Sequence, residues 1–420
     1  MNNSLNLQSL ALSRNGNMMI NALKDTDPFQ EKDFLNRIHR LDERLREQSI
    51  DGALILQNTD LYYFAGTIQQ SYLYIPSEGE PLLMVRKDFD RAKSESAIRL
   101  IEPIDGPKEI PTLLERKGYK IPHTLGFEGD VLPANLYFYY KMLFSGTELI
   151  DISHDIRLIR AAKSSAEIEC IQTAARSADM VLEKVKDFLC VGISEIEFSG
   201  RVEAFMRKLG HQGIVRMRMW GGEMFYGHLM AGSTAAVSSY MASPTGGEGI
   251  SPAVAQGPGF RKIKAREPIL VDFIFTHNGY LSDQTRIFAI ESLPDPLMSA
   301  HEAMIEVQEK LKKEATPGSK AGDLYALALE HVDNRGYSDY FMGADPKRVS
   351  FVGHGIGLEV DEYPFLAKGQ DLILEEGMII ALEPKLIFPG KGVVGIENTH
   401  VVTAQGLKQL NRFPDEVVII

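Results

Sequence analysis

The chain has 420 residues, with 57 Asp and Glu against 45 Lys and Arg, which gives a formal net charge of −12 at pH 7. A hydrophobic fraction of 44% and a charged fraction of 24% are ordinary for folded proteins and exclude disorder or a fibrous repeat. The carboxylate surplus argues against binding to nucleic acid or an anionic membrane, because phosphate recognition needs clustered Lys and Arg. A chain of this length usually divides into two or three domains.

The beginning of the chain and its cysteines bear on the compartment. Residues 1–27 form a polar leader without the unbroken apolar core of a secretory signal peptide, and no run of 18 apolar residues offers a membrane span. The two cysteines, Cys170 and Cys190, are expected to be reduced, buried thiols in one helix. These features predict a cytoplasmic protein.

From residue 28 to 158, short apolar runs occur between helical stretches. The first helix is expected over 31–48, where Phe34, Ile38 and Leu41 recur at helical spacing. Strands are expected at 52–57, 71–76, 81–86, 98–103, 124–129 and 148–153, and further helices at 90–97, 110–118 and 132–144. Strands alternating with helices predict an α/β domain.

Residues 159–420 are expected to form a second domain, of the α+β class, because its helices and strands occur in blocks. Ser194 and Glu197 have the spacing of a capping box, which predicts the start of a helix. The other helices are expected at about 161–189, 296–313 and 320–335, and the strand-rich stretches at 214–290 and 350–405.

Two aspartates lie eleven residues apart in the stretch PILVDFIFTHNGYLSDQTRIF. Asp272 interrupts an apolar run, where an unpaired carboxylate is costly to bury, so a positive partner is expected. Asn278 and Gly279 are typical of a hairpin turn, which would place Asp272 and Asp283 on neighbouring strands. The pair could then chelate one ion, although either aspartate alone is more typical of a turn or cap.

Two later segments add a histidine and two glutamates. His354 lies between glycines in VGHGIGLEVDEYP, where the backbone can approach a ligand closely. Glu383 and Glu397 each follow an apolar run in GMIIALEPKLIFPGKGVVGIENTHVV. Four carboxylates and one imidazole suit two divalent ions that share bridging carboxylates. No cysteine belongs to the set, so a structural zinc site is not expected.

In order, context and spacing, these residues resemble the pita-bread superfamily of creatinase, methionine aminopeptidase, Xaa-Pro dipeptidase and aminopeptidase P. The resemblance covers roughly residues 160–405, and the α/β domain before it is similar to that of the creatinase and prolidase branch. It implies an α/β creatinase-like domain followed by an α+β pita-bread domain. It also implies a homodimer.

The resemblance implies a role for each of the five residues. Asp272 resembles an aspartate that binds one metal, Asp283 and Glu397 resemble bridging ligands, and His354 completes the shell of one ion. Glu383 resembles a carboxylate that binds metal and takes a proton from the attacking water. The implied reaction is hydrolysis with two divalent ions, for which an oxygen-rich shell favours manganese, while cobalt, iron or zinc serve in relatives.

Several positions depart from the pattern of Xaa-Pro peptidases in this superfamily. Ser239 and Asp361 stand where two substrate-site histidines are usual, and Gly395 stands where an arginine is common beside the last ligand. His228 or His400 could supply an imidazole instead. Asp361 would favour a cationic or hydrogen-bond-donating group on the substrate.

Two expectations concern the segment before these strands. Arg218, with Arg216, could clamp an anionic substrate, but a solvated arginine fits the pattern at least as well. Trp220, the one tryptophan of the chain, is expected in the core or in a pocket wall.

Three hypotheses for function follow. The first is a dinuclear metal hydrolase of the Xaa-Pro dipeptidase or aminopeptidase type that acts on a small peptide or a related amide. Its candidate catalytic residues are Glu383, His354, Asp361 and His228. The second is a hydrolase or lyase that acts on a small non-peptide amide or zwitterion. The third is a metal-binding or interaction protein without catalysis. In none of them is nucleic acid or a membrane an expected partner.

Overall fold

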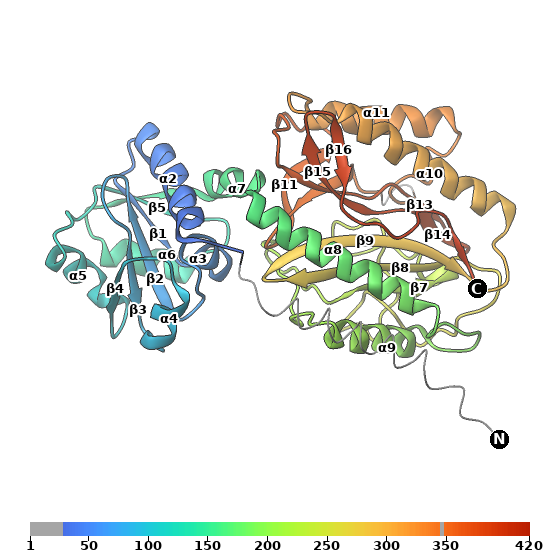
Figure 1. The fold of residues 1–420 in the computed structure, drawn as a ribbon, viewed down its shortest axis with the longest axis horizontal. Helices are drawn as coiled ribbons and strands as arrows, with labels where there is room; N and C mark the ends of the chain where they lie inside the picture. The colour runs from blue at the N-terminus through green and yellow to red at the C-terminus, as the bar shows by residue number, and fades with distance from the viewer. Residues whose placement is uncertain (1–27, 345–347) are drawn as a thin grey trace, which may run out of the picture. The chain divides into compact units, whose positions relative to one another are not determined.

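The computed structural model describes residues 28–344 and 348–420, so the expected polar leader lies outside the described residues. Two compact units make up the described chain (Figure 1). Residues 29–164 and 218–222 form the N-terminal unit, and residues 165–217 and 223–420 form the C-terminal unit. Among the described residues, none of the helices combines the length and the apolar character that crossing a bilayer requires.

The N-terminal unit is built around a six-stranded sheet of order β4-β3-β2-β1-β5-β6. β2 runs antiparallel to both β1 and β3, whereas the β3–β4, β1–β5 and β5–β6 pairs are parallel. The strands are β1 (Gly52–Ile55), β2 (Ser71–Pro76), β3 (Leu82–Val85), β4 (Leu100–Pro103), β5 (Thr124–Phe127) and β6 (Glu148–Asp151). Each apolar run expected to be a strand forms one.

Six α-helices belong to the described part of this unit. They are α2 (Glu31–Glu47), α3 (Asn58–Ala65), α4 (Phe89–Glu95), α5 (Ile110–Arg116), α6 (Ala134–Leu143) and α7 (Ser153–Ala161). The apolar stripe of α2, which includes Phe34, Ile38 and Leu41, is buried as its spacing predicts. α3 and α7 were not among the expected helices, because each is short and follows directly on a strand or its end.

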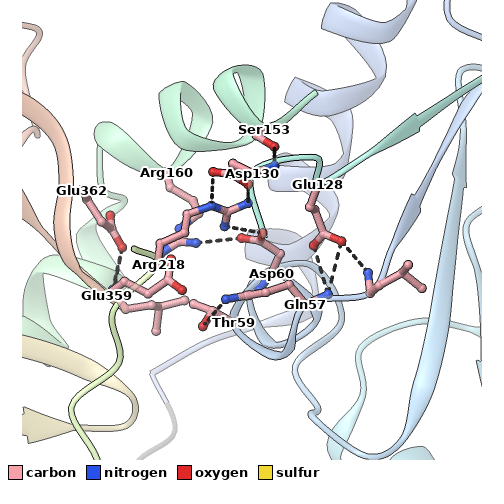
Figure 2. Close-up of polar contacts among 12 residues, drawn as sticks. Gln57, Thr59, Asp60, Glu128, Asp130, Ser153, Arg160, Arg218, Glu359 and Glu362 are labelled. Atoms are coloured by element: carbon pink, nitrogen blue, oxygen red, sulfur yellow. Dashed lines mark hydrogen bonds and ion pairs between the residues drawn. The ribbon is translucent and has the colours of Figure 1, made fainter. Parts of the chain in front are cut away.

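A buried ion-pair network lies at α3 of the N-terminal unit (Figure 2). Asp60 is fully buried, and its Oδ1 and Oδ2 accept hydrogen bonds of 2.7 Å from Arg160 and Arg218, respectively. Arg218 also donates to Asp130 at 2.7 and 2.9 Å, as Figure 2 shows. Its side chain is only 7% exposed, so the expectation of a solvated arginine is wrong.

Two further expectations are corrected. Trp220 is 94% exposed, because it lies in a surface turn and not in a strand or helix that packs on a core. Cys170 is a buried free thiol in α8 (Ser165–Val185), as expected. Cys190 lies beyond the end of that helix and is exposed, because the helix stops at Val185.

The C-terminal unit contains two larger sheets and a two-stranded ribbon. The first sheet has the order β17-β9-β8-β7, the second β11-β10-β12-β15-β16, and the ribbon pairs β13 with β14. The strands are β7 (Gly227–Ala231), β8 (Ile269–His277), β9 (Tyr280–Ala289), β10 (Phe351–Ile356), β11 (Val360–Ala367), β12 (Ile379–Leu382), β13 (Lys385–Phe388), β14 (Gly392–Gly395), β15 (Asn398–Thr403), β16 (Gly406–Gln409) and β17 (Val418–Ile419). Between residues 214 and 268 only β7 is a strand, because the glycine and proline residues there form turns.

Two helices cover one face of the first sheet. α8 and α9 (Glu195–Lys208) pack on β7, β8 and β9, and Figure 1 shows the green α8 lying across β8 and β9. The core between them includes Val181, Phe198, Leu229, Val271 and Phe273. Ser194 caps α9 by accepting the backbone N–H of Glu197, as its spacing predicts. The other two helices, α10 (Asp295–Glu314) and α11 (Ala321–Asn334), pack together and against strands from β10 onward.

Candidate metal centre

The hairpin of β8 and β9 carries the two aspartates. Asn278 and Gly279 have φ angles of 47° and 82°, the left-handed pair that a tight two-residue turn requires, so the predicted hairpin is confirmed. Asp283 pairs with Ile274, two residues from Asp272 on β8. Since residues two apart share a face, both carboxylates project from the same face of the hairpin. It is the face opposite to the one that α8 and α9 cover.

The second sheet places His354 beside this hairpin. It lies on β10, between β11 and β12. A Cβ on Gly353 would lie 2.7 Å from the carbonyl oxygen of Ala381, and one on Gly355 would lie 2.2 Å from that of Tyr363. The glycines therefore allow the neighbouring strands to approach, which is a different reason from the close approach of a ligand that the sequence suggested.

Both glutamates occupy irregular positions between strands. Glu383 follows β12 directly, and its N–H donates to the carbonyl of Val352 at 3.0 Å. Glu397 lies between β14 and β15 and exchanges two backbone hydrogen bonds with Thr285 of β9. The Thr285 hydroxyl also donates to Oε2 of Glu397 at 2.9 Å. These contacts fix both carboxylates at the junction of the two sheets.

Asp283, His354 and Glu397 converge on one buried point. Each offers a ligand atom, and the three atoms lie within 4.8 Å of one another. Oδ1 of Asp283 is buried and has no hydrogen-bond partner among the described residues. A buried carboxylate oxygen without a partner is unfavourable, and a cation at this point would satisfy it. Two carboxylates and an imidazole are suitable ligands for a divalent transition-metal ion.

The pKa shifts of these residues reflect the negative charge that is gathered at this buried point. Burial raises the pKa of Asp283 well above its ordinary value, and the nearby Glu397 and Asp272 raise it further. Burial also raises the pKa of Glu397 to about 7, although the ammonium of Lys385 opposes the shift. Burial alone would lower the pKa of His354, but Asp361, Glu383 and Glu397 outweigh it and raise that pKa. The cluster therefore favours positive charge.

Lys385, which no sequence motif singled out, lies among the other carboxylates. Its Nζ is 2.7 Å from Oε2 of Glu383, 2.7 Å from Oε2 of Glu397 and 3.3 Å from Oδ2 of Asp272. Burial lowers its pKa, but the three carboxylates outweigh that effect and raise the pKa well above its usual value. The expected positive partner of Asp272 is thus confirmed. The sequence feature that could have identified Lys385 is its position two residues after Glu383, because side chains two residues apart in an extended chain point to the same side.

Of the remaining candidates, Asp361 and His228 adjoin the cluster. Oδ1 of Asp361, on β11, is 3.6 Å from Nδ1 of His354, and Asp361 has a φ of 64°, which is rare for a residue other than glycine. His228 is buried on β7 directly opposite Asp272, with Nδ1 3.2 Å from Oγ1 of Thr245. Asp361 therefore lies beside His354, and His228 lies beside Asp272.

Two other positions play different parts. The hydroxyl of Thr399 contacts the backbone N–H and C=O of Asp283. His400, the next residue on β15, therefore points to the opposite face and cannot replace a substrate-site imidazole. Ser239 accepts a hydrogen bond from the N–H of Met241 at 3.0 Å, an ordinary turn contact.

His400→Leu is expected to leave turnover and metal content unchanged and to make the protein less sensitive to acid. Burial, with Lys312 next in effect, lowers the pKa of His400 to about 3. The unfolded chain, with a histidine pKa of about 6.5, then binds a proton that the folded chain does not. Stability therefore falls as the pH drops from about 6.5 toward 3. Urea denaturation at pH 4.5 and 7.5 measures the difference.

The exposed His39 provides the control, since His39→Leu should follow the wild type at both pH values. Loss of turnover in a well-folded His400→Leu protein would instead place this imidazole in the reaction.

Two family models match the chain. The model of metallopeptidase family M24 matches residues 169–404, and the model of the creatinase/prolidase N-terminal domain matches residues 37–162. The Xaa-Pro dipeptidase of Pyrococcus furiosus is 27% identical over 384 residues, which cover 91% of this chain and 99% of that protein. These matches agree with the expected order of an α/β and an α+β domain.

Solved structures give the same result. The Xaa-Pro dipeptidase from Bacillus anthracis has a TM-score of 0.78 at 27% identity, covering 92% of this chain and 100% of that one. The prolidase from Pyrococcus horikoshii OT3 has a TM-score of 0.75 at 27% identity, covering 90% and 99%. The expected fold class, including the pita-bread domain, is confirmed.

Proposed function

We propose that this chain, which belongs to metallopeptidase family M24, is a metal-dependent hydrolase that cleaves a peptide or amide bond. The convergence of Asp283, His354 and Glu397, with the unpartnered oxygen of Asp283 among them, is the observation that carries the proposal. These three residues would hold a divalent ion. When bound, such an ion supplies Lewis acidity toward the substrate carbonyl and a lowered pKa for the attacking water.

His354 is oriented for this task. Its Nδ1 lies 3.1 Å from the carbonyl oxygen of Gly355, and donation there leaves Nε2 unprotonated as the ligand atom. Nε2 faces Oε1 of Glu383 at 3.7 Å and Oε1 of Glu397 at 3.9 Å. The ligand nitrogen is therefore directed into the carboxylate cluster.

Glu383 is the proposed general base. Oε2 accepts a hydrogen bond from Lys385, which leaves Oε1, on the His354 side, to receive the proton of the attacking water. The same carboxyl could then return the proton to the leaving amine. Burial of Glu383 among other charged groups holds this oxygen in one position.

For the substrate, we propose a small peptide, with Xaa-Pro dipeptides tested first because relatives of this length carry that name. A second candidate, a small non-peptide amide or zwitterion with a cationic group, is favoured by the carboxylate of Asp361 beside His354. Manganese is the proposed ion because carboxylate oxygens outnumber nitrogen in the ligand set. The homodimer and the cytoplasmic location stay predictions from the sequence.

The test is a metal-dependent hydrolysis screen. Protein stripped with a chelator is assayed with Mn²⁺, Co²⁺ or Zn²⁺ on Xaa-Pro dipeptides, longer Xaa-Pro peptides and small amides. Activity is expected on at least one amide class, only after an ion is restored, and not in the Asp283→Asn variant. Unchanged activity after stripping would contradict metal dependence. A fully loaded protein that hydrolyses no amide would support the third hypothesis, a metal-binding protein without catalysis.

A further inference from the structure

The ammonium group of Lys385 is arranged like a bound cation. Its three N–H donors face three carboxylates, those of Glu383, Glu397 and Asp272, at 2.7, 2.7 and 3.3 Å. The lysine side chain is only 2% exposed. No donor is left for water, so the carboxylates alone compensate the buried charge.

The carboxylates around Lys385 are members of the ligand set that the sequence predicted for two ions. The cluster therefore contains two cation positions that share Glu397. One lies among Asp283, His354 and Glu397, and the other is the position of the lysine nitrogen. The charges fit this division, because four ionised carboxylates nearly balance one divalent ion and one ammonium. A second divalent ion added beside the lysine would reverse the sign of the buried charge.

The strand opposite Lys385 approaches it closely. Lys385 begins β13 and pairs with Gly395 of β14. A Cβ at position 395 would lie 2.5 Å from the carbonyl oxygen of Pro384, and 2.7 Å from Cα and 3.0 Å from Cγ of Lys385. The glycine at this position therefore allows the two strands to approach closely beside the lysine. Turning the buried ammonium away would break its hydrogen bonds to three carboxylates, which is unfavourable.

We propose that the Lys385 ammonium permanently occupies one of the two cation positions, so that the protein binds a single divalent ion. The inference rests on the proposed function, because it takes Asp283, His354 and Glu397 as the ligands of that ion. It changes the part of Asp272 and Glu383, which hold the lysine and not a second metal.

The experiment counts ions. Stripped protein is saturated with Mn²⁺, passed through a desalting column and analysed for metal per folded chain. The wild type is expected to hold about one ion, and Lys385→Ala about two, because the substitution vacates the second position and leaves its carboxylates. Lys391→Ala is the matched control, since Lys391 is an exposed lysine in the turn between β13 and β14. It should hold about one ion.

A second measurement needs no variant. Electron paramagnetic resonance of the Mn²⁺-loaded wild type should show the six-line spectrum of an isolated ion, whereas two ions that share Glu397 would give an exchange-coupled spectrum. Two ions in the wild type, or one in a folded Lys385→Ala protein, would overturn the inference while leaving the proposed function intact. The proposed function fails on different results, namely activity that survives removal of the metal or a loaded wild type that hydrolyses no amide, whereas a wild type that holds no ion would overturn both.

Discussion

Glu383→Gln is expected to lower turnover by about 10²- to 10⁴-fold, the usual loss when a general base is removed. The amide keeps an oxygen for the hydrogen bond from Lys385 but cannot accept a proton from the attacking water. Asp283, His354 and Glu397 are unchanged, so the variant should keep its metal. Steady-state kinetics should show the loss mainly in kcat, because the interaction is made in the transition state.

Glu376→Gln is the control, since Glu376 is an exposed carboxylate just before β12 and should have no effect on turnover. Turnover within a few-fold of the wild type in Glu383→Gln would remove Glu383 from the role of base. Loss of the ion together with activity would instead make Glu383 a metal ligand, as the sequence resemblance implies.

Arg286→Met is expected to lower the free energy of unfolding by about 3–5 kcal/mol, the usual loss when one partner of a buried charged network is removed. Arg286 is fully buried on β9, and although burial lowers its pKa to about 10, it stays charged at pH 7. Besides the carbonyl of the preceding residue, its guanidinium donates hydrogen bonds to five acceptors. These are the carbonyls of Glu397, Phe413 and Pro414 and the side chains of Asn398 and Asp415. Methionine fills much of the volume but satisfies none of them.

The same contacts predict weaker metal binding, because Arg286 donates a hydrogen bond to the backbone carbonyl of Glu397 and so helps to fix this ligand. Chemical denaturation and a Mn²⁺ titration measure the two effects. Arg266→Met, at an arginine whose side chain is 70% exposed, should change stability by less than about 0.5 kcal/mol. An Arg286→Met protein as stable as this control would mean that ordered water replaces the guanidinium.

Much of the fold could be predicted because its signals are local. The hairpin at Asn278 and Gly279 follows from turn chemistry and the strands from apolar runs, and both depend on neighbours within a few residues. The convergence of Asp272 and Asp283 follows once that turn is fixed. The other candidate ligands, His354, Glu383 and Glu397, could be predicted only from the order of several motifs along the chain. No single motif distinguishes a metal ligand from a structural residue.

What could not be predicted depends on pairing between distant segments. Lys385 looks like an ordinary strand lysine until the register of β13 on β14 and the position of β8 bring three carboxylates to it. Arg218 pairs with Asp60, 158 residues away in sequence. The sequence does not distinguish His400 from His228 as a candidate imidazole. Only strand register shows that His228 lies toward the ligands and that His400 points away from them. Periodicity within one strand contains none of this information.

The contacts of Lys385 also bear on how the protein survives when metal is scarce. A cation that is part of the chain cannot be lost by dilution, by chelators or by competition among ions, so it offsets part of the charge of its carboxylates from the moment the strands assemble. In newly made, metal-starved protein the ammonium should therefore weaken the repulsion among these carboxylates, although it does not remove that repulsion. The metal-free chain would then stay folded until it binds its ion and would resist proteolysis. The supply of metal would therefore affect the activity of the protein more than its amount in the cell.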